Sequence, residues 1–190
     1  KSDNSVNLTY IIPGEHYGSI LNFDQQKSKK YLLAGYLDTM KKYNYLAGSK
    51  FYFYGSGDII KTMFDSLTEI QKNKALSILG INKESRVIEL FYDMVIKTEA
   101  AENRSIRILE NLATITNINP IAVYTQQDLL ELILNRIDSS KANLPLIEII
   151  RNIQYGKTID FLKYLSANSN ITTEIPDGYN NFFTKFDTLL

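Results

Sequence analysis

The sequence contains no cysteine and one histidine, and these absences exclude much of the chemistry that side chains can perform. Without cysteine the chain has no disulfide, no thiol nucleophile and no thiolate ligand for a metal. His16 is the single histidine, so a zinc site with two histidines is excluded and a Ser-His pair would have to use this residue. We therefore predict no metal site and no cofactor.

An excess of charge of one sign is missing as well, and so are long apolar runs. Lys and Arg together number 21, as do Asp and Glu, which gives a formal net charge of zero. Nucleic-acid-binding domains normally carry a basic excess because contacts with phosphates supply much of their affinity, so we predict no nucleic-acid partner. No apolar run reaches the roughly 18 residues of a membrane-spanning helix, and we predict no transmembrane segment.

What is present is typical of one globular domain. The 190 residues are 44% hydrophobic and 22% charged, which is enough to build a core. The polar start KSDNSVN lacks methionine and is typical of a mature form whose signal segment has been removed. We expect an exported bacterial protein or lipoprotein, periplasmic or at the cell surface, with the removed N-terminus as the place of a lipid anchor. A cytoplasmic location stays open as the alternative.

The fold class is predicted to be mainly α. In VNLTYII, residues 6–12, apolar side chains alternate as in a strand, and residues 1–24 are expected to form an extended arm whose strand pairs with residues 50–54. Residues 25–190 are expected to form a single-domain bundle of five or six helices.

The expected helices follow apolar periodicity and cap residues. The first covers residues 27–47, with Gly48 as its C-cap. The second begins at the N-cap Asp58 and ends at Gly80, with a break around residues 72–74. A third continues without glycine or proline to about residue 115. Thr125 and Asp128 form a capping pattern for the next helix. Later helices follow Pro145, and residues 179–190 are expected to form a short helix or docked tail.

The stretch SKFYFYGSGD, residues 49–58, raises the question whether it binds a ligand. As a strand it would place Phe51 and Phe53 on one side and Tyr52 and Tyr54 on the other. Glycines before a helix favour anions, but the spacing lacks the phosphate-loop and dinucleotide patterns, and Asp58 would repel a phosphate. We favour a structural turn capped by Asp58 over an anion site.

Two groups of residues were considered for catalysis. His16 lies between Glu15 and Tyr17, which would suit acid–base chemistry, but flanking glycines make this loop a poor holder of catalytic geometry.

Carboxylates are the second group. Glu99, Glu102 and Glu110 share the expected third helix with Arg104 and Arg107, and we predict a solvent-exposed, ion-paired helix face there. We therefore predict that the chain is not an enzyme. A hydrolase that uses Asp or Glu remains a third alternative.

Tyrosine is unusually abundant, with 13 residues against no tryptophan. Tyrosines are enriched at protein interfaces, so the leading hypothesis is a non-enzymatic domain that binds a protein partner. The predicted contact residues lie between positions 43 and 54: Tyr43, Tyr45, Phe51, Tyr52, Phe53 and Tyr54. The first alternative is a carrier that holds an apolar small molecule, such as a fatty acid, between its helices.

A second alternative comes from a resemblance. The segments YLLAGYLDTM and GDIIKTMFDSL resemble the helix pair of small periplasmic immunity proteins, which neutralise secretion-system effectors. The resemblance implies a periplasmic immunity-type protein that binds an effector. Those proteins usually carry cysteines near both helices, and this chain has none.

Overall fold

The computed structural model describes residues 9–13, 24–81, 87–95, 103–139 and 153–171, which contain seven helices and two short strands. The mainly α fold class is confirmed. The elements follow in the order α1 (Gln25–Lys42), β1 (Tyr52–Phe53), α2 (Ile59–Asp65), α3 (Glu69–Leu79), α4 (Val87–Val95), α5 (Arg104–Ile115), β2 (Val123–Tyr124), α6 (Gln126–Ser139) and α8 (Ile153–Asn168).

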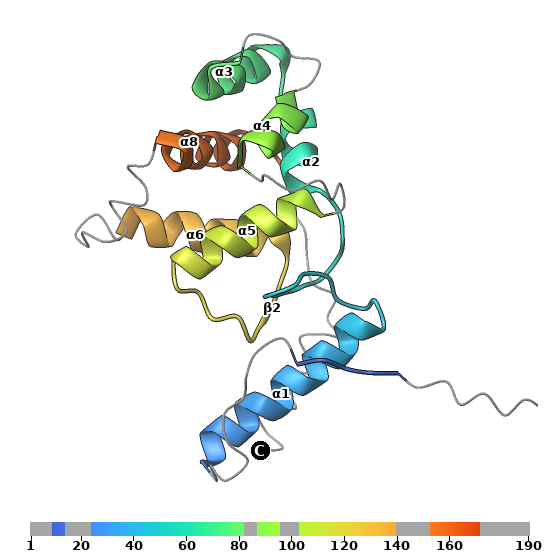
Figure 1. Ribbon diagram of the computed structural model, residues 1–190. Helices are drawn as coiled ribbons and strands as arrows, with labels where there is room; N and C mark the ends of the chain where they lie inside the picture. The colour runs from blue at the N-terminus through green and yellow to red at the C-terminus, as the bar shows by residue number, and fades with distance from the viewer. Residues whose placement is uncertain (1–8, 14–23, 82–86, 96–102, 140–152, 172–190) are drawn as a thin grey trace, which may run out of the picture.

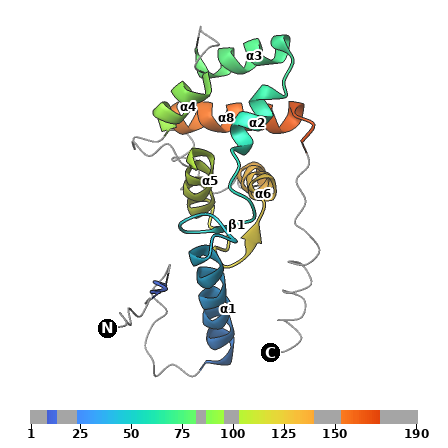
Figure 2. The same ribbon diagram turned by 90° about the vertical axis from the view of Figure 1, so that its right-hand side faces the viewer.

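The elements are arranged along one direction, with α1 at one end (Figure 1). At the opposite end α8 packs against α3, α2 and α4. The pair α5 and α6 forms the middle of the molecule, and the two strands lie between this pair and α1 (Figure 2). The helix α1 therefore projects from a body that the other helices form.

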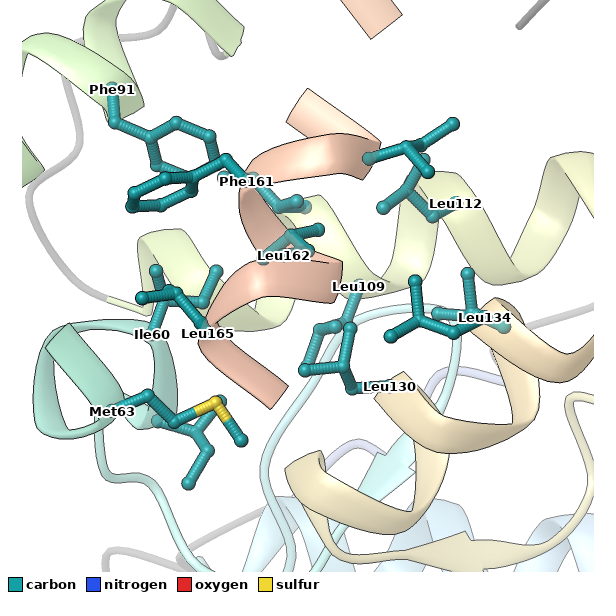
Figure 3. Close-up of a cluster of buried hydrophobic side chains, with 14 of the residues drawn as sticks. Ile60, Met63, Phe91, Leu109, Leu112, Leu130, Leu134, Phe161, Leu162 and Leu165 are labelled. Carbon is teal, nitrogen blue, oxygen red and sulfur yellow. The ribbon is translucent and has the colours of Figure 1, made fainter. Parts of the chain in front are cut away.

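The core of the body is built from apolar side chains of six helices, and Figure 3 shows part of it. Phe91 of α4 and Phe161 of α8 are fully buried, and their ring centroids lie 4.7 Å apart. Leu109 of α5 and Leu130 of α6 meet below α8, and Ile60 of α2 closes one side. Each such side chain contributes roughly 1.5–3 kcal/mol when it leaves water.

A smaller core attaches α1 to the body. It consists of Ala34 and Leu37 from α1 together with Leu46, Tyr52 and Ile121. The buried residues of α1 all lie in its C-terminal half, whereas Leu32 in the N-terminal half is 59% exposed. The attachment therefore uses only part of the helix.

Most of the predicted helix caps are confirmed. The Asp58 carboxylate accepts a hydrogen bond from the Lys61 backbone N–H at 3.0 Å, so this residue begins α2. Gly80 ends α3 in the left-handed conformation with φ 73°. The Thr125 hydroxyl accepts from the Asp128 N–H at 3.0 Å and begins α6.

Two predicted helix boundaries are wrong, because polar residues start α3 and α5 at positions other than those expected. The break in the second helix lies at residues 66–68 and not at 72–74, since Thr68 and Gln71 form a capping box that starts α3. The expected long third helix is interrupted, because Asn103 adopts a left-handed φ of 59° and α5 starts afresh after it.

The end of the first helix also differs. The helix α1 stops at Lys42, and Asn44 turns the chain with φ 61°, so Gly48 is not its C-cap. The prediction was wrong because the apolar periodicity continues past Asn44. Asparagine adopts the left-handed conformation at little cost, so the helix can end before it.

The predicted strand pairing is corrected. The partner of β1 is β2, in parallel register with Tyr52 opposite Val123 and Phe53 opposite Tyr124, while Ala47 bridges to Phe53 on the other edge. Residues 9–13 of the expected arm are extended and belong to no strand of the described chain. The rest of the arm, the region from Pro145 to residue 152 and the tail lie outside the described residues.

Candidate functional site

The turn before β1 is built around a buried carboxylate. Glu110 of α5 is 3% exposed, and its Oε1 accepts hydrogen bonds from the backbone N–H groups of Ser49, Lys50 and Phe51 at 2.6, 2.8 and 3.1 Å. Its Oε2 accepts from the Ser49 hydroxyl at 2.7 Å. This result corrects the prediction of a solvent-exposed position for Glu110. Its neighbours Ile106, Leu109 and Ala113 show that the residue lies on the buried face of α5.

Gly48 is required by this turn for two reasons. Its φ of +99° is a conformation that side chains other than glycine rarely adopt. A Cβ atom would also lie 2.5 Å from the Phe51 carbonyl oxygen and 3.0 Å from Glu110 Oε1. The glycine therefore allows the backbone to wrap around the carboxylate.

Lys41 closes the same turn from the side of α1. Its Nζ donates to the Ser49 carbonyl oxygen at 3.0 Å and lies 4.0 Å from the centroid of the Tyr52 ring. Burial lowers the pKa of Lys41, and the nearby Asp38 and Glu110 carboxylates oppose this shift in part. The Tyr52 hydroxyl in turn donates to Asp38 at 2.8 Å.

The strand β1 separates the two cores. Phe51 and Phe53 point into the large core and Tyr52 into the small one, which confirms the predicted alternation. These three side chains are only 2%, 0% and 4% exposed, in the order Phe51, Phe53, Tyr52, so they are not available to a partner in this conformation.

The other predicted contact residues are accessible. Tyr43 and Tyr45 follow the end of α1 and are 57% and 60% exposed. Tyr54 is half-buried and lines a cavity on the far side of β1. The structure therefore does not bring the six predicted residues together into one surface.

A cavity with a volume of about 300 Å³ borders the GSGD turn. It lies where the two parallel strands end and the chain turns into α2 and α6. Its walls come from the end of β1 and the turn, from the first turns of both helices and from the end of the described chain: Tyr54, Gly55, Gly57, Asp58, Ile59, Thr62, Thr125, Gln126 and Ile171.

Gln126 holds the cavity's two sides together. Its side-chain oxygen accepts from the Ser105 hydroxyl at 2.7 Å and from the Ile59 N–H at 3.4 Å, and its side-chain N–H donates to the Gly57 carbonyl. This buried amide therefore fixes the glycine turn relative to α5 and α6. Sequence reasoning did not identify it, because its partners lie 21 to 69 residues away.

Asp58 is the carboxylate at the cavity. Besides capping α2, it accepts a hydrogen bond from the hydroxyl of Tyr92. Burial, followed by the hydrogen bond and the charge of Asp58, raises the pKa of Tyr92 well above its ordinary value. Tyr92 therefore keeps its proton and acts as a donor to Asp58.

The residues considered for catalysis gain no support as a group. Glu15, His16, Tyr17, Glu99 and Glu102 lie outside the described residues. The two oxygens of Glu110 accept four hydrogen bonds, which is the arrangement of a structural carboxylate. Within the described ranges no three acidic or histidine side chains are placed to hold a metal ion, and no helix is long and apolar enough to cross a membrane.

Comparisons with other proteins do not indicate a function for the chain. We compared the sequence with protein-family models and with curated proteins, and the structure with solved structures, and found no match in any of the three.

Proposed function

We propose that the chain is a non-enzymatic binding domain that docks onto an acidic surface of another protein through α1 and the turn that follows it. The observation that supports this proposal most directly is the exposure of Tyr43 and Tyr45, at 57% and 60%, where the chain leaves the C-terminal end of α1. Tyrosine offers a large contact area at low entropic cost, and it is enriched at protein interfaces.

An exposed apolar stripe on α1 extends this surface. Leu32, Tyr36 and Tyr43 recur at steps of four and seven residues, which places them on one side of the helix axis. Leu32 is 59% exposed and Tyr36 is half-buried. We call Leu32, Tyr36, Tyr43 and Tyr45 the α1 contact surface. Such aromatic and aliphatic groups would supply most of the binding energy of an interface.

The charges on α1 indicate the chemistry of the partner. The helix carries five lysines, Lys27, Lys29, Lys30, Lys41 and Lys42. Lys41 is engaged by the Ser49 carbonyl oxygen and the Tyr52 ring, so the other four supply the exposed positive charge. The acidic residue within the helix, Asp38, is buried and bonded to Tyr52, so it does not neutralise the exposed side. Because the whole chain has equal numbers of basic and acidic residues, the rest of it is acidic. A partner with an acidic surface would therefore be attracted to α1 and repelled by the remainder.

The experiment that tests this proposal uses the immobilised chain and an extract of its source organism at low and high salt. The wild-type chain should retain one partner at low salt, and the Tyr43→Ala/Tyr45→Ala variant should lose most of it. Ile70→Ala is the matched control, because Ile70 is 84% exposed but lies on α3, at the other end. Equal retention by the two variants, or binding that does not weaken with salt, would contradict the proposal.

Export and lipid anchoring belong to this proposal as expectations from the sequence. An immunity-type role, in which the partner is an effector protein, is compatible with the same contact surface. Neither adds to the geometric argument.

A further inference from the structure

We propose that the cavity beside the GSGD turn binds a small amphipathic amine, with the ammonium group at the Asp58 carboxylate and the apolar part against Ile59, Ile171 and the ring of Tyr54. The cavity volume of about 300 Å³ is at the lower end of the range for small-molecule sites. This site is separate from the α1 contact surface, so the two proposals can fail independently.

The position of the cavity in the fold is one that suits a ligand. β1 and β2 run parallel, and the chain leaves both strands at the same end, after Phe53 and after Tyr124. The two connections separate beyond this end, and the cavity lies between them. Gln126 fixes the position of one connection, because its side-chain amide bonds both to Gly57 in the turn and to Ser105 in α5.

The charge of Asp58 determines which ligand fits. Its hydrogen-bond donors are neutral, namely the Lys61 backbone N–H and the Tyr92 hydroxyl. The side chain of Lys61 forms its ion pair with Asp65, although the charge of Asp58 also acts on it. Arg104 lies 3.8 Å from Asp93 and over the ring of Tyr92. Among the described residues, therefore, no lysine or arginine forms an ion pair with Asp58. A partly buried carboxylate whose hydrogen-bond donors are neutral is stabilised by a nearby cation.

The hydroxyl groups of the two threonines that line the cavity are already engaged. The Thr62 hydroxyl donates to the Asp58 carbonyl oxygen at 2.8 Å, and the Asp128 N–H at the start of α6 donates to Thr125. An anionic ligand would find the helix ends capped and a carboxylate at the wall. A fatty acid, the ligand expected from the sequence for a carrier, would bring its own carboxylate toward Asp58 and be repelled.

The test is a titration of the isotope-labelled full chain with hexylamine, hexanol and hexanoate, followed by amide chemical shifts at neutral pH. These three probes share an apolar chain and differ in the head group. We expect saturable shifts at Gly55, Gly57 and Ile59 with hexylamine, at an affinity about tenfold above that of hexanol, and no saturation with hexanoate.

Two variants separate the role of Asp58 from a general effect of charge. Asp58→Asn removes the charge but keeps a side chain that caps helices well, so the fold should be retained, and Asp58→Ser gives a second variant with the same property. Both should weaken hexylamine binding about tenfold. Glu131→Gln removes one negative charge from an exposed position on α6 that does not line the cavity, and it should leave the affinity unchanged.

Three results would overturn the inference. Hexanoate could bind as tightly as hexylamine, Glu131→Gln could weaken binding as much as Asp58→Asn does, or the shifts could appear away from the cavity. Absence of saturable binding by hexylamine would overturn it as well.

Discussion

The aromatic residues between positions 43 and 54 divide into two regions at Gly48. Before the glycine, Tyr43 and Tyr45 are more than half exposed, and after it Phe51, Tyr52 and Phe53 are almost completely buried. The two regions are alike in composition and only a few residues apart. Aromatic content therefore did not determine which of them is available to a partner.

The difference comes from contacts distant in sequence. Glu110, about 60 residues further along the chain, binds the turn at Ser49 and Phe51 and draws it against α5. Pairing with β2 then places residues 51–53 between the two cores. The earlier region has no such partner strand, and Asn44 turns it away from the end of α1 with φ 61°.

The two glycine turns that flank β1 show the same contrast for carboxylates. Glu110 is enclosed by four hydrogen bonds, and it serves the fold. Asp58 caps a helix and binds Tyr92, yet it also borders a cavity. The carboxylate of Glu110 is saturated by the protein, whereas Asp58 is the one for which we propose a ligand.

The largest effect on stability is expected on the buried side of the division. Phe53→Ala should lower the free energy of unfolding by about 4 kcal/mol, because it removes a fully buried ring from the large core. Tyr45→Ala, the matched change on the exposed side, should alter it by less than about 0.5 kcal/mol. Urea denaturation measures both, and similar losses would remove the distinction between the two regions.

The next largest effect concerns the carboxylate that holds the turn. Glu110→Ala should cost about 3 kcal/mol, since three backbone N–H groups lose their acceptor. Glu131→Ala removes an exposed carboxylate from α6 and serves as the control, with an expected change within about 0.5 kcal/mol. A loss for Glu110→Ala no larger than for the control would show that the turn forms without the carboxylate.

A smaller loss is expected for the glycine itself. Gly48→Ala should destabilise the chain by about 2 kcal/mol, because φ is +99° and the new Cβ would meet the Phe51 carbonyl oxygen. Gly57→Ala is the comparison in the second turn, where a Cβ meets no atom within 4 Å, and it should be neutral or slightly stabilising. Thermal denaturation measures both variants. A larger loss of stability for Gly57→Ala than for Gly48→Ala would contradict the roles given to the two turns.

The smallest effect concerns the hydrogen bond between Tyr92 and Asp58. Tyr92→Phe should cost about 1 kcal/mol at neutral pH. The pKa of Tyr92 is raised in the fold above the value of about 10 that a tyrosine has when unfolded. Unfolding above that pH releases a proton, so the stabilisation is fully present below about pH 10 and is lost as the pH rises further.

The measurement for this prediction is the free energy of unfolding of both proteins from about pH 8 to 11. The advantage of the wild type over Tyr92→Phe should shrink above about pH 10. Because Lys41 and Tyr124 also have shifted pKa values, only the difference between the two proteins isolates Tyr92. A constant difference over this range would show that Tyr92 does not carry its pKa shift in the fold.

Local features of the fold could be predicted from the sequence. The caps at Asp58, Gly80 and Thr125 depend on partners no more than four residues away, and such short-range chemistry is readable in the sequence. The alternation of Phe51, Tyr52 and Phe53 is a property of any strand.

Long-range features could not be predicted. The parallel partner of β1 lies about 70 residues away, and the residue types of Val123 and Tyr124 do not indicate which strand they pair with. The acceptor role of Glu110 depends on a turn of another segment, although its position on the apolar face of α5 was a readable signal. The cavity likewise exists only once two separate helix starts are brought together.

In our proposal Tyr43 and Tyr45 contact a partner and contribute little to stability. The most direct test measures Tyr43→Ala/Tyr45→Ala in two ways, by urea denaturation and by retention of a partner on the immobilised chain. We predict an unfolding free energy within about 1 kcal/mol of the wild type together with loss of most of the retained partner. A folded variant that retains the partner as well as the wild type and Ile70→Ala do would contradict the claim.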